Sequence, residues 1–149
     1  MTEDPQALLG RIYNEQQITE SNLTILQQRM EVLQVYRTNY SAGLAVLEEL
    51  EKRKEGEQML MNVGGSIFVD ARLMNPSKVI RGIGNGVRIE QSVADAKEAV
   101  IEALTSLQKQ YDTLTQEYEK LLVHASNLNS QFQQLAAQIQ SAKIPSQEE

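Results

Sequence analysis

The chain has 149 residues, of which 41% are apolar and only 5% aromatic, and it contains neither Cys nor Trp. The absence of Cys excludes disulfides, Cys-ligated zinc and thiol catalysis, and it suits a reducing compartment, so we expect a soluble cytoplasmic protein. A net charge of −6 disfavours nucleic acid as a partner, and no apolar run is long enough to cross a membrane.

The first predicted element is a long helix over residues 6–56. Pro5 stands where a helix can begin, after Glu3 and Asp4, and Gly56 is the expected C-terminal cap. Within this range, side chains alternate at spacings of three and four residues, which predicts the seam of a coiled coil. The seam positions are Leu9, Ile12, Gln16, Thr19, Leu23, Leu26, Met30, Leu33, Arg37, Tyr40, Leu44 and Leu47.

In residues 57–91 the heptad repeat of apolar residues stops, and the sequence is typical of short strands separated by turns. We expect a short strand at 59–61, a β-rich segment at 66–73, a turn at Asn75-Pro76-Ser77 and a returning strand at 78–83. Asn85-Gly86 forms the next turn, because both residues accept positive φ, and residues 87–90 close the set. Such a small sheet cannot bury its apolar face alone, so we expect this insert to pair with other chains.

A second long helix is predicted over residues 92–143, with Ser92 as its N-terminal cap and Asp95 at the capping-box position. Because its length matches that of the first helix, we expect an antiparallel hairpin in which both chain termini meet at one tip. The whole chain, 1–149, is then a single domain that is mainly α: a long antiparallel coiled-coil hairpin with a small β insert. The second seam is Val93, Lys97, Val100, Leu104, Leu107, Tyr111, Leu114, Tyr118, Leu121, Ala125, Leu128, Phe132, Leu135, Ile139 and Ala142.

Charge is distributed unevenly along both helices. Residues 121–142 contain no Asp, Glu, Lys or Arg, and residues 16–28 of the first helix contain only Glu20. A coiled coil that acted only as a spacer would have little reason to lose its solubilising charges at one end. The tip is therefore a candidate adhesive surface.

The insert gives the chain a specific resemblance. Its glycines and strands, at 63–69, 78–80 and 82–90, lie between heptad helices of equal length, and in this it resembles the prefoldin family. Two hairpins in the insert resemble the α type of subunit in archaea. The resemblance implies an ATP-independent holdase without cofactors, in which two α and four β subunits join their hairpins into a double β barrel. It also implies that the coiled-coil tips hold non-native polypeptides and pass them to a group II chaperonin.

Two residue sets are candidates for these contacts. The tip residues Leu8, Tyr13 and Ile144 lie off the seam, whereas the other tip candidates on the seam serve either client binding or helix packing. The full tip set is Leu8, Leu9, Ile12, Tyr13, Leu135, Ile139 and Ile144. For the oligomer interface and barrel core, the expected residues are Ile67, Phe68, Val69, Val79, Ile80, Ile83, Val87 and Ile89.

Other chemistry finds little support in the sequence. The glycine run 82–86 is similar to a phosphate-binding loop, but no helix follows it directly. His124 is the only histidine and has no second ligand of its kind for a metal, and the acidic cluster 48–51 precedes basic residues on a helix. We therefore expect no enzyme activity and no metal, and the alternative function is a structural tether whose arms space two sites.

Overall fold

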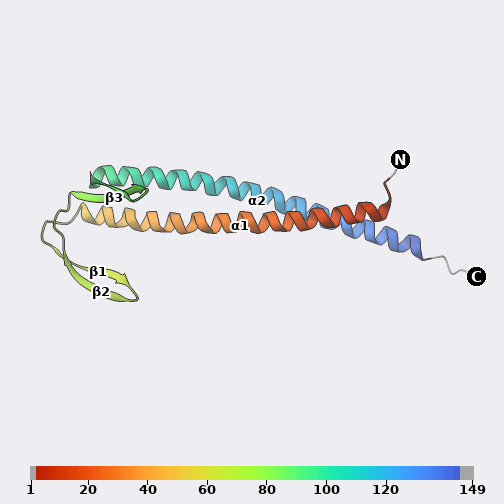
Figure 1. Cartoon of the computed structure of the whole chain (residues 1–149), viewed down its shortest axis with the longest axis horizontal. Helices are drawn as coiled ribbons and strands as arrows, with labels where there is room; N and C mark the ends of the chain where they lie inside the picture. Colours follow the sequence, from red (N-terminus) through yellow and green to blue (C-terminus); the bar gives the residue numbers. More distant parts are fainter. Residues whose placement is uncertain (1–2, 145–149) are drawn as a thin grey trace, which may run out of the picture. The chain divides into compact units, whose positions relative to one another are not determined.

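The computed structural model describes residues 3–144. Two long helices, α1 (Pro5–Leu50) and α2 (Val93–Lys143), stand on either side of four strands in the chain (Figure 1). The strands are β1 (Gln58–Gly64), β2 (Ile67–Arg72), β3 (Lys78–Gly84) and β4 (Val87–Ser92). The chain divides into two compact units, of which unit 1 contains residues up to 33 and from 110 onward, and unit 2 contains residues 34–109. No helix among the described residues is long and apolar enough to span a membrane.

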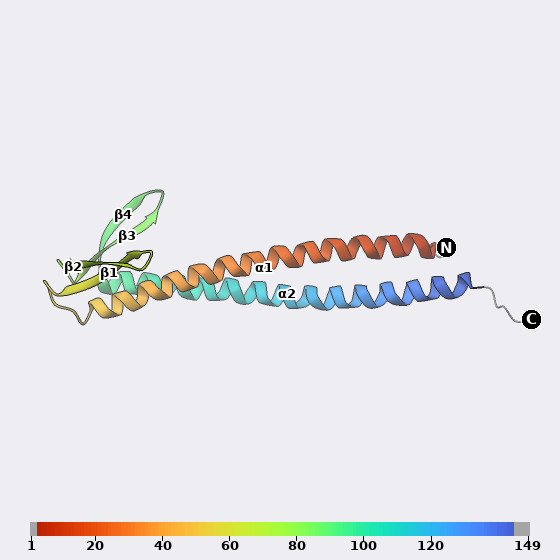
Figure 2. The ribbon, with the colours of Figure 1, turned by 90° about the horizontal axis from the view of Figure 1, so that it is seen from below.

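In unit 1 the two helices run antiparallel; they cross in the view of Figure 1 and lie side by side in that of Figure 2. The rings of Tyr13 and Phe132 lie 6.4 Å apart between centroids, and His124 Nε2 lies 2.9 Å from Glu15 Oε1. These contacts join the first part of α1 to the last part of α2. The antiparallel pairing predicted from the two heptad patterns is therefore confirmed in this unit.

The predicted seam is the packed side of each helix. Ile12, Thr19, Leu47, Val93 and Leu128 are buried, and nearly all other seam positions are half-buried. Two positions differ from the prediction. Tyr40 remains 41% exposed, although the seam tyrosines Tyr111 and Tyr118 are half-buried, and Ala142 is exposed next to the end of α2.

Helix α1 ends at Leu50, six residues before the predicted boundary at 56. The N–H groups of Lys52 and Arg53 donate to carbonyls three residues back, at 3.0 and 3.2 Å, which tightens the last turn and ends the helix. Gly56 does not cap this end. Its φ of 81° instead directs its N–H to the carbonyl of Leu73, at 2.7 Å, so that Gly56 belongs to the base of the first hairpin.

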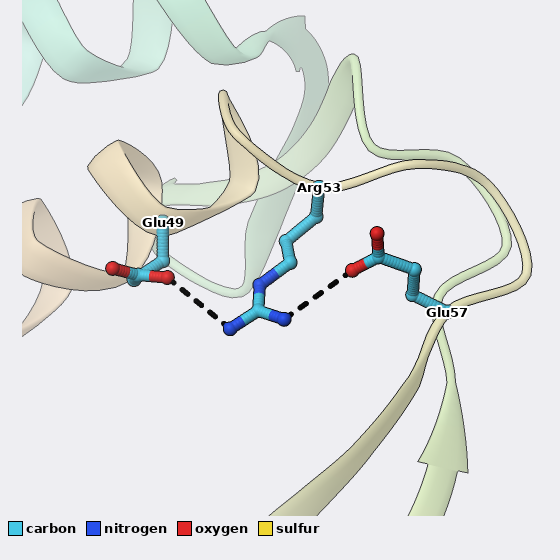
Figure 3. Close-up of polar contacts among 3 residues, drawn as sticks. All are labelled: Glu49, Arg53 and Glu57. Atoms are coloured by element: carbon cyan, nitrogen blue, oxygen red, sulfur yellow. Dashed lines mark hydrogen bonds and ion pairs between the residues drawn. The ribbon is translucent and has the colours of Figure 1, made fainter.

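Arg53 connects the end of α1 with the start of β1. Its guanidinium contacts Glu49 on the helix at 3.4 Å and Glu57 before the strand at 3.3 Å (Figure 3). Glu49 of the acidic cluster 48–51 is thus paired with a cation, as expected for a solvated helix face. Because all three side chains are well exposed, each pair contributes little to stability.

The strands form two separate antiparallel hairpins, β1–β2 and β3–β4. The two hairpins expected in the insert are confirmed. The sequence suggested that residues 78–83 return onto residues 66–73, but strand β3 pairs with β4 instead. Asn75 explains the difference, because its Oδ1 accepts hydrogen bonds from the N–H and the hydroxyl of Ser77, which makes this segment a connection between hairpins. The β1–β2 hairpin stands clear of the helices of unit 2 in Figure 1, and the β3–β4 hairpin does so in Figure 2.

Both hairpins follow one plan. Each has a register shift before its turn, so that Val63 and Ile83 are the extra residues of a bulge. Each turn then has two residues with positive φ, Gly65-Ser66 in the first hairpin and Asn85-Gly86 in the second. The turn predicted at Asn85-Gly86 is confirmed.

The core of unit 2 lies where the two helices meet the second hairpin. Leu47, Val93 and Ala96 are buried, and Leu50, Val79 and Val100 pack against them. The predicted cap of α2 is also present here, because the Asp95 N–H donates to Ser92 Oγ at 3.1 Å. This core holds the base of β3 and β4 against the helices.

Candidate interaction surfaces

The hairpins of unit 2 expose most of the residues predicted to form an oligomer interface. The exposed fraction runs from 47% for Val69 to 73% for Ile80. The members of the predicted set that are exposed are Ile67, Phe68, Val69, Ile80, Ile83 and Val87. Two members behave differently, because Val79 packs in the core of unit 2 and Ile89 is half-buried.

One face of the β1–β2 hairpin is almost entirely apolar. Met61 lies opposite Val69 and Met59 lies opposite Ala71, so these residues share a face with Ile67. The opposite face is mixed, because Leu60 is paired with Asp70 and Asn62 with Phe68. An apolar face of this kind in water is typical of a surface that another chain covers.

Several exposed apolar residues of the hairpins were not predicted. Leu60, Met61 and Val63 on β1 are more than half exposed, and so is Met74 in the connection between hairpins. The alternation of β1 was the signal that could have identified Met61 and Val63 from the sequence. It was missed because the expected strand at 59–61 was too short to show a repeat.

We call the end of unit 1 where α1 begins and α2 ends the terminal end. It contains the residues predicted to bind clients at the tip. Ile12 is 8% exposed, so it belongs to the seam, and Leu8, Leu9, Leu135 and Ile139 are half-buried. Tyr13 and Ile144 are 52% and 73% exposed. The structure thus separates the tip candidates into one packing residue, four partly covered residues and two open ones.

A shallow groove of about 290 Å³ lies between the helices at the terminal end. Its apolar lining comes from Leu8, Ile12 and Leu135, and Gln131, Gln134 and Gln138 supply neutral amides. Arg11 and Glu15 complete the lining; Arg11 is paired with Glu3 at 3.1 Å and Glu15 with His124. Such a groove offers apolar contact and amide hydrogen bonding with little net charge.

A third exposed set lies on α1 in unit 1. Ile18, Ile25 and Val32 are spaced by seven residues and are 62%, 44% and 53% exposed. The seven-residue spacing places them on one side of the helix, next to the seam. The sequence contained this signal, but it was hidden by the stronger three-four repeat of the seam itself.

Comparison with known proteins identifies the family. The prefoldin family model, described as prefoldin subunit, matches residues 19–138. This chain belongs to the prefoldin family. It is 29% identical over 124 residues to prefoldin subunit alpha of Archaeoglobus fulgidus, a match that covers 83% of this chain and 88% of that relative. It is 24% identical over 132 residues to prefoldin subunit alpha of Methanobrevibacter smithii, covering 89% and 90% of the two chains.

The fold agrees with this family assignment. A cryo-EM structure of filamentous prefoldin from Methanocaldococcus jannaschii superposes with a TM-score of 0.66 at 20% identity, covering 79% of this chain and 98% of that chain. Membership of the prefoldin family supports the role of a chaperone subunit that assembles with other prefoldin subunits. The resemblance stated from the glycines and strands of the insert is therefore confirmed.

Proposed function

We propose that this prefoldin subunit is an ATP-independent holdase that captures non-native polypeptides at the terminal end of unit 1. The observation that carries the proposal is the combination of exposed Tyr13 and Ile144 with a stretch, 121–142, that has no Asp, Glu, Lys or Arg. A non-native chain exposes apolar side chains, which such a surface can cover while desolvating few charges. Captured clients then pass to a group II chaperonin.

Assembly is the second part of the proposal. The exposed apolar residues of the two hairpins join β-type subunits, two α with four β, in a shared β barrel. Two observations support this: the apolar face of β1–β2 and the exposure of Ile80, Ile83 and Val87 on β3–β4. We place the assembly in the cytoplasm, because a chain without Cys suits a reducing compartment.

The free energy of these apolar contacts favours weak, reversible binding of clients. Full burial of one side chain the size of Leu contributes roughly 1.5–3 kcal/mol, and the partly covered residues of the terminal end can gain only part of that. A single subunit therefore holds a client weakly. Several subunits that act on one client raise the apparent affinity through effective concentration, and release then needs only competition by the next chaperone.

The test is light scattering by a thermally unfolding enzyme, without ATP, in the presence of this chain assembled with a β-type prefoldin subunit. We expect the assembly to delay aggregation. The double variant Tyr13→Ser/Ile144→Ser should weaken the delay, whereas Val35→Ser, which changes an equally exposed residue of α1 in unit 2, should leave it unchanged. Intact assemblies that give no delay would sink the holdase proposal and favour a tether with one defined partner.

A further inference from the structure

The turn of the second hairpin brings together the two groups needed for a chemical modification. Asn85 and Gly86 form its two central residues, with φ of 51° and 75°, and both are exposed. We propose that Asn85 is a self-modification site, at which the chain converts its own asparagine through a succinimide to isoaspartate and aspartate. The only co-reactant is water.

The reaction balances with groups that the turn supplies. The deprotonated Gly86 nitrogen attacks Asn85 Cγ, the bond from Cγ to the side-chain nitrogen breaks, and ammonia leaves with the proton taken from Gly86. Water then opens the cyclic imide. Cleavage of its bond to Cγ gives aspartate, and cleavage of its bond to the main-chain carbonyl gives isoaspartate, in which the chain runs through the side chain.

Gly86 makes the attack sterically open. It has no side chain to obstruct the approach, and among residues 3–144 its N–H donates no backbone hydrogen bond. The turn lies outside the ladder, which closes with the pair Gly84 and Val87. The nucleophile and the amide carbon are thus adjacent in sequence, exposed to hydroxide, and not packed against any core.

The remaining asparagines lack this combination. Asn62 precedes the β-branched Val63 and its Oδ1 accepts the Gly64 N–H at 2.9 Å, while Asn75 precedes Pro76, which has no N–H. The others lie within helices, where the following N–H belongs to the intrahelical hydrogen-bond ladder. These helical residues are Asn14, Asn22, Asn39, Asn127 and Asn129.

The first hairpin supplies matched control variants. Its turn, Gly65-Ser66, has φ of 58° and 61° and the same bulge before it, so the geometry does not require Asn. Asn85→Gly copies the first turn residue and removes the reactive amide. Gly86→Ser copies the second turn residue and keeps the amide, but it adds a side chain beside the nucleophile.

Isoaspartate changes the hairpin in a way that aspartate does not. It adds a carbon atom to the main chain within a two-residue turn, so the pairing of Gly84 with Val87 cannot keep its register. Aspartate retains the backbone and tolerates the left-handed conformation. If the proposed assembly through Ile83 and Val87 holds, chains with isoaspartate should be excluded from it, a consequence that rests on the proposed function.

The experiment is peptide mapping of the full chain after incubation in mildly alkaline buffer, native and in urea. Trypsin cleaves after Arg81 and Arg88, so the peptide 82–88 contains Asn85 alone among the asparagines. We expect the mass of this peptide to rise by the difference between an amide and a carboxylic acid, and the product to separate into two species. The rate of the reaction should be proportional to the hydroxide concentration. One species should accept a methyl group from an isoaspartyl methyltransferase.

Comparison between sites and variants decides the outcome. Peptides with Asn62 and Asn75 should remain unchanged. The variant Gly86→Ser should lose its unmodified 82–88 peptide more slowly than the unsubstituted chain does. The variant Asn85→Gly should show no conversion of this peptide and should retain the circular dichroism spectrum of the unsubstituted chain. A native chain that keeps Asn85 intact while the urea-unfolded chain loses it would overturn the proposal, because the turn would then be protective. Faster reaction at another asparagine would overturn it as well.

Discussion

At the scale of single residues, burial in this protein depends on the place in the seam more than on chemical type. Thr19, a polar residue, is 3% exposed, whereas Ile18, its apolar neighbour, is 62% exposed. Spacing therefore predicted the packed residues better than hydrophobicity did. Ala96 is the main residue that spacing missed: it is 2% exposed although it lies off the seam, because a small side chain lets helix and hairpin approach closely.

Substitutions at Ile12 and Ile18 test whether the place in the seam determines a residue's contribution to stability. Both are isoleucines of α1 in unit 1, but Ile12 is 8% exposed and Ile18 62%. We expect Ile12→Ala to lower the free energy of unfolding by about 2–4 kcal/mol, because it leaves a cavity in the seam. Ile18→Ala should change it by roughly 0.5 kcal/mol or less.

Urea unfolding of both variants, followed by circular dichroism, gives this comparison. Equal losses for the two would mean that Ile18 also packs against something in solution, contrary to its exposure in the structure.

At the scale of elements, the sequence predicted where helices and turns lie better than where they end or pair. The start of α2 could be predicted because Ser92 is a local signal. The end of α1 could not, because residues 51–56 favour a helix locally and the contact that removes them, Gly56 with Leu73, comes from the hairpin. The presence of two hairpins was predicted correctly, but residues 78–83 were expected to return onto residues 66–73, because nothing local distinguishes a turn within a hairpin from a connection between hairpins.

Two glycines of β3 test the bulge that both hairpins share. Gly84 has a φ of 111°, a conformation that side chains rarely adopt, whereas Gly82 has no positive φ and an added methyl group there meets no atom within 4 Å. Gly84→Ala should therefore destabilise the hairpin by about 1–3 kcal/mol. Hydrogen exchange of the β4 amides should accelerate by roughly tenfold or more.

Gly82→Ala is the matched control, and it should leave this exchange unchanged or slow it. Similar acceleration in both variants would show that loss of glycine itself, and not the backbone conformation at 84, weakens the hairpin.

At the scale of the whole molecule, the protein separates its two candidate surfaces into two units. The terminal end belongs to unit 1, and the exposed hairpins belong to unit 2. The sequence predicted both surfaces in outline, because charge depletion marked one and alternating strands marked the other. It did not predict which seam residues stay accessible, since that depends on how much of each side chain the opposite helix covers.

This separation predicts that assembly can be removed without unfolding the helices. The double variant Ile67→Asp/Ile80→Asp places a carboxylate on each hairpin, at sites that are 60% and 73% exposed. We expect loss of the complex with a β-type subunit, because burial of an unpaired charge costs several kcal/mol. Size-exclusion chromatography with light scattering measures the complex, and circular dichroism should report unchanged helix content.

Met74→Asp is the control, because Met74 is 80% exposed but lies outside the strands. A complex that survives the double variant would exclude the hairpins as the assembly surface.

The stretch without charged residues, 121–142, has a consequence for the solution conditions in which the protein works. Contacts between ions weaken as ionic strength rises, and the Debye length falls from about 10 Å at 0.1 M to about 3 Å at 1 M. Apolar contacts lack this weakness, and excluded salts strengthen them. If the proposed capture of clients uses this stretch, we expect binding to persist across a wide range of salinity, including concentrations at which ion pairs such as Lys97 with Glu51 are largely screened.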